Sequence, residues 1–159
     1  MIRSIIELGH PVLRTPADPV RDFDRELAAL VRDLEETVDH PGRAGLAAPQ
    51  IGVGLRVFSY NIDGEIGHLV NPTITELSAE TQDGDEGCLS VPGIWAPTVR
   101  AMRAVAEGFD ATGKPLRLEG EGLMARCLQH EVDHLDGKVF LDRLTGEARK
   151  TALLALRSR

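Results

Sequence analysis

Residues 130–134 of this 159-residue chain read His-Glu-Val-Asp-His, inside a stretch whose apolar residues recur at helical spacing. Because residues four apart lie one above the other on an α-helix, His130 and His134 can both reach a single cation. Glu131 then sits beside that cation, where it can take a proton from a bound water and pass it to a leaving group. The motif predicts a helix at about residues 122–136, ended by Gly137 in the left-handed conformation, and it indicates a metallohydrolase.

The composition indicates one globular domain over residues 1–159. Hydrophobic residues make up 42% of the chain but aromatic residues only 4%, so we expect an aliphatic core. No apolar run approaches the roughly 20 residues that span a bilayer, and the first residues lack the apolar stretch of a signal peptide. The net charge of −7 argues against a protein that coats nucleic acid. We therefore expect a cytoplasmic protein with no DNA partner and no membrane partner.

The remaining elements are predicted from hydrophobic period and turn residues. Apolar residues of 27–38 recur at helical spacing, with Asp22 or Asp24 as N-cap and Pro41 and Gly42 beyond the end. Residues 45–52 are rich in Gly and Pro and favour a turn that carries Gln50. Strands are expected at residues 55–62, 67–71, 73–77, 101–109 and 115–118, and a last helix follows Thr145, whose hydroxyl can cap it. This order predicts an α+β fold with short antiparallel strands around the central His-Glu-Val-Asp-His helix.

A catalytic metal site with two histidines needs a third protein ligand and keeps one position open. The candidates are Cys88, Asp133, Asp136, Glu86, His10, His40 and His68. Cys88 is favoured on chemical grounds, because a thiolate binds a divalent metal tightly and the neighbouring Gly87 lets a loop backbone come close. Cys127 lies on the apolar side of the predicted helix, where a free thiol behaves as a small buried residue.

Three separated blocks of the sequence add to this pattern. Residues 45–52 read Gly-Leu-Ala-Ala-Pro-Gln-Ile-Gly, residues 86–90 read Glu-Gly-Cys-Leu-Ser, and residues 129–137 read Gln-His-Glu-Val-Asp-His-Leu-Asp-Gly. Together, and in this order, they resemble the peptide deformylase family. The early residues 10–14, His-Pro-Val-Leu-Arg, are similar to the family's usual opening, so the resemblance covers nearly the whole chain.

The resemblance implies a hydrolase that removes the formyl group from the N-terminal formyl-methionine of nascent polypeptides and releases formate. It assigns the metal to Cys88, His130 and His134, with a metal-bound water that attacks the formyl carbon and Glu131 as general base and then acid. Gln50 and the backbone N–H of Leu89 would hold the formyl oxygen as negative charge develops on it. The residues that the resemblance assigns to substrate binding are Ala44, Gly45, Glu86, Gly87, Leu123 and Cys127.

The expected cofactor is one divalent metal ion. Two imidazoles and a thiolate suit zinc by softness, and zinc outranks ferrous iron in intrinsic affinity. The family that the chain resembles, however, works best with Fe(II). We therefore expect Fe(II) in the cell and zinc or nickel in purified protein.

Two sites depart from the family's usual pattern. Arg43 stands where a glycine is common, followed by Ala44 where a larger apolar residue often lies near the methionine pocket. Arg126 replaces an apolar residue often found before the cysteine of the metal helix. These changes are expected to widen or polarise the pocket for the first side chain.

Trp95 either rims the cleft or covers a sheet edge, and Arg100 forms either a structural ion pair or a substrate contact.

Other interpretations stay open at this point. The His-Glu-Val-Asp-His pattern is shared with zinc peptidases, although no downstream third ligand of that class is recognisable, and another N-acyl amide hydrolase also fits. A binding module with a structural metal would need a fourth ligand that is not apparent.

The cations near the chain end are those of a solvated last helix or a surface for transient ribosome contact. They are Arg149, Lys150, Arg157 and Arg159.

Overall fold

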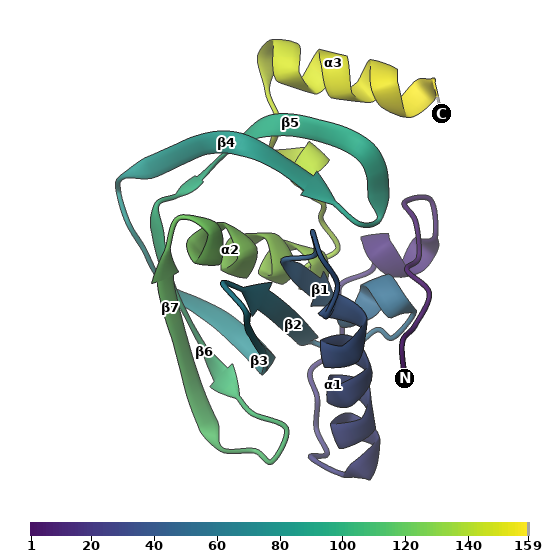
Figure 1. Ribbon diagram of the computed structural model, residues 1–159, viewed down its shortest axis with the longest axis vertical. Coiled ribbons are helices and arrows are strands. Elements are labelled where there is room, and N and C mark those ends of the chain that lie inside the picture. The colour runs from purple at the N-terminus through teal and green to yellow at the C-terminus, as the bar shows by residue number, and fades with distance from the viewer. Residues whose placement is uncertain (159) are drawn as a thin grey trace.

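The computed structural model describes residues 1–158, in which two antiparallel sheets lie on either side of one central helix (Figure 1). The described helices are α1 (Arg25–Val38), α2 (Leu123–Leu135) and α3 (Gly146–Arg157), with short 3₁₀ helices η1 (Pro11–Arg14), η2 (Ala48–Ile51) and η3 (Phe140–Arg143). The described strands are β1 (Gly45–Ala47), β2 (Val57–Ile62), β3 (Glu65–Leu77), β4 (Thr81–Cys88), β5 (Val91–Ala101), β6 (Arg103–Phe109) and β7 (Pro115–Glu121). The predicted α+β class is confirmed, although β3 is longer than expected and neither β4 nor β5 is among the predicted strands.

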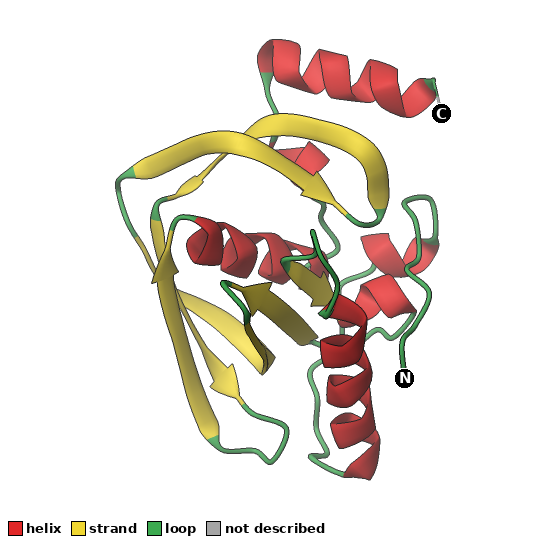
Figure 2. Ribbon diagram, viewed as in Figure 1, coloured by secondary structure: helices red, strands yellow, loops and turns green. Residues whose placement is uncertain are grey.

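The helix that carries the His-Glu-Val-Asp-His motif, α2, is enclosed by both sheets. One side packs on the five-stranded sheet, ordered β1-β2-β3-β6-β7, and the other faces the β4–β5 hairpin (Figures 1 and 2). Gly137 follows the helix at a φ of 78°, as predicted, and a Cβ there would lie 2.8 Å from the carbonyl oxygen of Arg14. The core between α2 and the large sheet consists of Ala17, Ala47, Phe58, Leu69, Ala104, Ala106, Ala125, Leu128 and Leu135.

The first helix, α1, also follows the sequence pattern. Asp24 is its N-cap, and the side chain accepts a hydrogen bond from the backbone N–H of Leu27 at 3.0 Å. The apolar stripe of α1 is buried against β1 and β2, which fixes β1 at the edge of the large sheet. Among the described residues, no helix has the length and apolar character needed to cross a membrane.

The main correction to the predicted elements is the β4–β5 hairpin. The sequence predicts a loop around Cys88, but Cys88 is the last residue of β4. Acidic residues and glycines give β4 a low strand propensity, so pairing with β5 and burial of Glu86 and Cys88 must stabilise it. Ala101 ends β5, and the strand expected at residues 101–109 begins instead at Arg103.

Three smaller predictions are also wrong. The strands expected at residues 67–71 and 73–77 are one strand, β3, whose register shifts where Asn71 has a φ of 50°. Residues 45–52 form the strand β1 and the helix η2 and not one irregular turn, although Gln50 does lie on a turn, that of η2. Thr145 is the N-cap of α3, but its hydroxyl donates or accepts no capping hydrogen bond.

Candidate metal centre and active site

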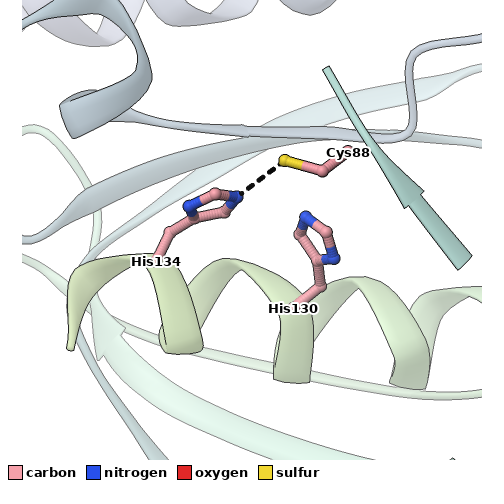
Figure 3. A group of neighbouring side chains, drawn as sticks. All are labelled: Cys88, His130 and His134. Carbon is pink, nitrogen blue, oxygen red and sulfur yellow. Dashed lines mark hydrogen bonds between the residues drawn. The ribbon is translucent and has the colours of Figure 1, made fainter. Parts of the chain in front are cut away.

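Three buried side chains converge between α2 and the end of β4. His130 and His134 project from neighbouring turns of α2 toward Cys88, whose Sγ lies 3.2 Å from His134 Nε2 (Figure 3). One ligand atom from each residue lies within 4.8 Å of the others. Three ligands of one tetrahedral ion stand roughly 3.5 Å apart, so this donor set fits a single divalent metal after small side-chain rotations. Burial lowers the pKa of His134 well below its ordinary range, which favours the neutral imidazole that a metal needs.

Glu86 orients one of these histidines. Its Oε2 lies 2.6 Å from His130 Nδ1, and Arg100 donates to both carboxylate oxygens from Nε and Nη2. Burial alone would raise the pKa of Glu86, but the hydrogen bonds from His130 and Arg100 hold that pKa well below its usual range. A carboxylate on Nδ1 leaves Nε2 of His130 with its lone pair toward the metal position, the arrangement common around metal-bound histidines.

Glu131 lies beside the cluster without joining it. The residue is 2% exposed, and its Oε1 has no hydrogen-bond partner among the described residues. Burial raises the pKa of Glu131 to about 7, which suits a group that takes and returns a proton near neutral pH. Gly45 of β1 makes room for this carboxylate, because a Cβ there would lie 2.5 Å from Glu131 Oε2.

Gln50 reaches the same place from η2. It is 1% exposed, and its Oε1 accepts a hydrogen bond from the backbone N–H of Ala47 at 2.9 Å. Its Nε2 donates to Ser90 Oγ at 3.1 Å and lies 3.7 Å from Cys88 Sγ. An amide nitrogen carries two hydrogens, so one N–H of Gln50 is directed to Ser90 and the other toward the proposed metal ligand Cys88.

A cavity of about 760 Å³ opens onto this cluster. Cys88, His130 and Glu131 form part of its wall. The six residues expected to bind substrate also line it: Ala44, Gly45, Glu86, Gly87, Leu123 and Cys127. Trp95 lies at its rim with 66% of the residue exposed and its ring against Gly87, where a Cβ would come within 2.7 Å of the indole. The rim position predicted for Trp95 thus matches the structure better than cover of a sheet edge.

Comparison with known proteins agrees with this geometry. The family model for polypeptide deformylase matches residues 2–150. This chain belongs to the polypeptide deformylase family. It is 60% identical to the peptide deformylase of Acidothermus cellulolyticus over 156 residues. The aligned region covers 98% of this chain and 86% of that protein. The chain is therefore an enzyme of the metal-dependent amide hydrolase class.

Solved structures of peptide deformylases share the fold. That of Legionella pneumophila has a TM-score of 0.91 and 42% identity, covering 99% of this chain and 95% of that one. That of Thermus thermophilus has a TM-score of 0.91 and 41% identity, covering 99% of this chain and 94% of that one. The helix and sheets that build the cluster therefore follow the peptide deformylase fold.

The following other residues predicted as a possible third ligand form ion pairs or hydrogen bonds with groups outside the cluster of Cys88, His130 and His134. Asp133 is buried in ion pairs with Arg100 and Arg143, each with an N–O distance of 2.7 Å. Arg100 therefore forms a structural ion pair, one of the two roles predicted for it. Asp136 pairs with Arg56 at 3.0 Å. His10 accepts a hydrogen bond from Val12 on η1, and His68 accepts one from Ala111.

Cys127 differs from Cys88 in its surroundings. Its Sγ lies 3.5 Å from the carbonyl oxygen of Ala44, and burial raises the pKa of its thiol well above the ordinary value. Both cysteines are free thiols. Cys127 is thus a neutral wall residue of the cavity.

Sequence reasoning missed several supports of the site. Ser90 accepts a hydrogen bond from Gln50, and Arg143 forms an ion pair with Asp133. The ring of Phe140 stacks on that of His130, with 6.4 Å between the ring centroids. The sequence predicted Glu86 only as a metal ligand or a substrate-binding residue, and not as the partner of His130. A strand assignment for residues 81–88 would have found the support role, because alternation puts Glu86 and Cys88 on one face.

Proposed function

We propose that this protein removes the formyl group from the N-terminal formyl-methionine of nascent polypeptides, releasing formate and a free amine. The observation that carries the proposal is the convergence of Cys88, His130 and His134 beside the buried carboxylate of Glu131 at the wall of a cavity. We further propose that the whole chain, residues 1–159, acts as one such domain.

The metal ligands in this proposal are Cys88, His130 and His134. A divalent ion held there would polarise the formyl carbonyl and lower the pKa of a water molecule. We propose Fe(II) as the ion in the cell, with zinc or nickel able to replace it in purified protein, since imidazole and thiolate ligands suit all three. Glu86 keeps His130 in the orientation and tautomer that binding requires.

Glu131 is the proton-transfer group. A carboxyl with a pKa of about 7 is partly ionised at neutral pH, so it can take a proton from the attacking water and give it to the leaving amine. Its unpartnered Oε1 has no competing donor among the described residues. Gly45 leaves the space that the carboxylate occupies.

Gln50 and Leu89 supply the hydrogen bonds to the formyl oxygen. The Gln50 amide is fixed by Ala47 and Ser90, so the N–H that points toward Cys88 Sγ is oriented before substrate arrives. We assign the second hydrogen bond to the backbone N–H of Leu89, which follows the metal ligand Cys88. Donors fixed in advance stabilise a developing oxyanion without reorganisation cost, and removal of one costs about 10²- to 10³-fold in rate.

The cavity would hold the first side chain of the substrate. Ala44, Leu123 and Cys127 give part of it an apolar lining suited to the unbranched methionine side chain, and Glu86 and Gly87 also line it. β1 is an edge strand of the large sheet beside this cavity, so its free backbone groups can pair with an extended peptide.

For the cell, we propose a cytoplasmic enzyme that makes transient ribosome contact through α3. Ala152 is buried where α3 packs near β5, whereas Lys150 is 75% exposed at its side chain. Arg149 and Arg157 share this helix, and Arg159 lies outside the described residues. Charge reversal of Arg149, Lys150 and Arg157 should weaken ribosome cosedimentation; unchanged cosedimentation would rule out this contact.

The decisive experiment measures formate release from a short formyl-methionyl peptide, using protein loaded with Fe(II) without oxygen. Glu131→Gln, which keeps the shape but removes the base, should lower the rate by about 10²- to 10⁴-fold. An acetyl-methionyl peptide serves as the control for other N-acyl hydrolases. No formate from folded, loaded protein, or equal release of acetate, would contradict the proposal.

A further inference from the structure

Arg126 lies on α2, the helix that also carries His130 and His134. It precedes His130 by one turn of α2, so both side chains leave the same face of the helix. The Arg126 side chain is 9% exposed. Its Nη1 donates to Glu86 Oε1 at 2.7 Å and to the carbonyl oxygen of Thr98 at 2.9 Å. The guanidinium is thus turned to Glu86 and β5.

With this contact, each carboxylate oxygen of Glu86 accepts two hydrogen bonds. Oε1 accepts from Arg126 and from Arg100 Nε at 3.0 Å, whereas Oε2 accepts from Arg100 Nη2 and faces His130 Nδ1 at 2.6 Å. Arg100 divides its donors between Glu86 and Asp133. Arg126 therefore adds a second donor to Oε1 and further restrains rotation of the carboxylate about its last bond.

We propose that Arg126 is a positioning residue that fixes Glu86 and, through it, the imidazole of His130. The inference rests on the metal ligands proposed above. Because Glu86 is 4% exposed, a lost donor cannot be replaced readily by bulk water. Loss of the Arg126 contact should let the Glu86 carboxylate turn and weaken its hydrogen bond to His130, which loosens one metal ligand. Partners of this kind change metal affinity by about 10- to 100-fold.

The test compares zinc-loaded wild type, Arg126→Met, Arg126→Lys and Arg56→Met. Arg56 is the matched control, because it also donates to α2, at the carbonyl oxygen of Leu135 and at Asp136, without contact to the site. The readouts are the rate of zinc release to excess chelator and the downfield proton resonance of His130 Nδ1. Arg126→Met should release zinc about 10- to 100-fold faster and shift that resonance. Arg126→Lys, which keeps a cation near Glu86, should fall between wild type and Arg126→Met.

The outcomes separate positioning from packing. If Arg126→Met unfolds more easily yet keeps the wild-type release rate and resonance, as Arg56→Met should, the inference is overturned. If Arg126→Met does not fold, Arg126→Lys decides: faster release with a shifted resonance supports the inference, and wild-type values for both overturn it. Cys88→Ala tests the ligand set separately, because a wild-type rate of zinc release in that variant would refute Cys88 as a ligand regardless of Arg126.

Discussion

At the scale of single residues, Gly45 sets how closely β1 approaches the acid-base group. A Cβ at this position would lie 2.5 Å from Glu131 Oε2 and 2.9 Å from Cys127 Sγ. Gly45→Ala should therefore displace the Glu131 carboxylate and lower kcat by about 100-fold, the cost of a misplacement near 1 Å. Steady-state formate release measures this loss. Gly54→Ala is the control, since a Cβ there meets nothing within 4 Å; equal activity in both variants would refute the steric argument.

Gln50 combines a structural and a chemical task in one residue. Gln50→Ala removes the acceptor for Ala47 and the donor to Ser90, so it should destabilise the fold by about 1–3 kcal/mol. It should also lower kcat by about 10²- to 10³-fold through loss of the oxyanion donor. Ser90→Ala removes only the support and should cost much less activity. Urea unfolding and formate release, measured side by side, check both parts; full activity in Gln50→Ala would exclude the donor role.

At the scale of elements, Asp133 joins α2 to β5 and η3. It pairs with Arg100 of β5 and Arg143 of η3, and its side chain is 8% exposed. Asp133→Ala removes one of the two carboxylates that pair with the buried Arg100 and the partner of the half-exposed Arg143, so it should lower the free energy of unfolding by about 1.5–3 kcal/mol. Asp136→Ala, one turn on, breaks a pair whose acid is 48% exposed and should cost less than about 1 kcal/mol. Similar losses in urea titrations of the two variants would contradict this view.

The same ion pairs predict a pH dependence. Burial alone would raise the pKa of Asp133, but hydrogen bonds from Arg143 and Arg100 hold that pKa below its ordinary value of 3.8. A lowered folded-state pKa means that the stabilisation is full above pH of about 4 and is lost as the pH falls through the lowered value. The difference in unfolding free energy between wild type and Asp133→Ala should therefore shrink in acid. A constant difference down to acid pH would show that the charge contributes nothing.

At the scale of the whole molecule, the metal site ties the β4–β5 hairpin to α2. A ligand that binds only the folded state stabilises it by about 4 kcal/mol at a thousandfold excess over its Kd. Removal of the metal by a chelator should thus lower the urea midpoint, and added zinc should restore it. His134→Ala should show one midpoint with or without zinc. An apo protein as stable as the loaded protein would mean that the metal does not join the two elements.

Much of the fold could be predicted from local pattern. The α1 and α2 helices, Asp24 as a cap and Gly137 as a stop all agree with the structure, because helical period and capping depend on near neighbours in the chain. The β4 strand could not be predicted, since its acidic residues and glycines do not favour a strand. It exists because β5 pairs with it and because Glu86 finds three buried cationic or imidazole partners there.

The sequence by itself determined that His130 and His134 share a helix face with Glu131 next to them, since spacing on one helix decides this. Only the tertiary structure decided that Cys88 would meet those histidines, that Glu86 would orient His130, and that Gly45 would lie against Glu131. These contacts join residues more than forty positions apart, and they form because the two sheets close over the buried α2 helix.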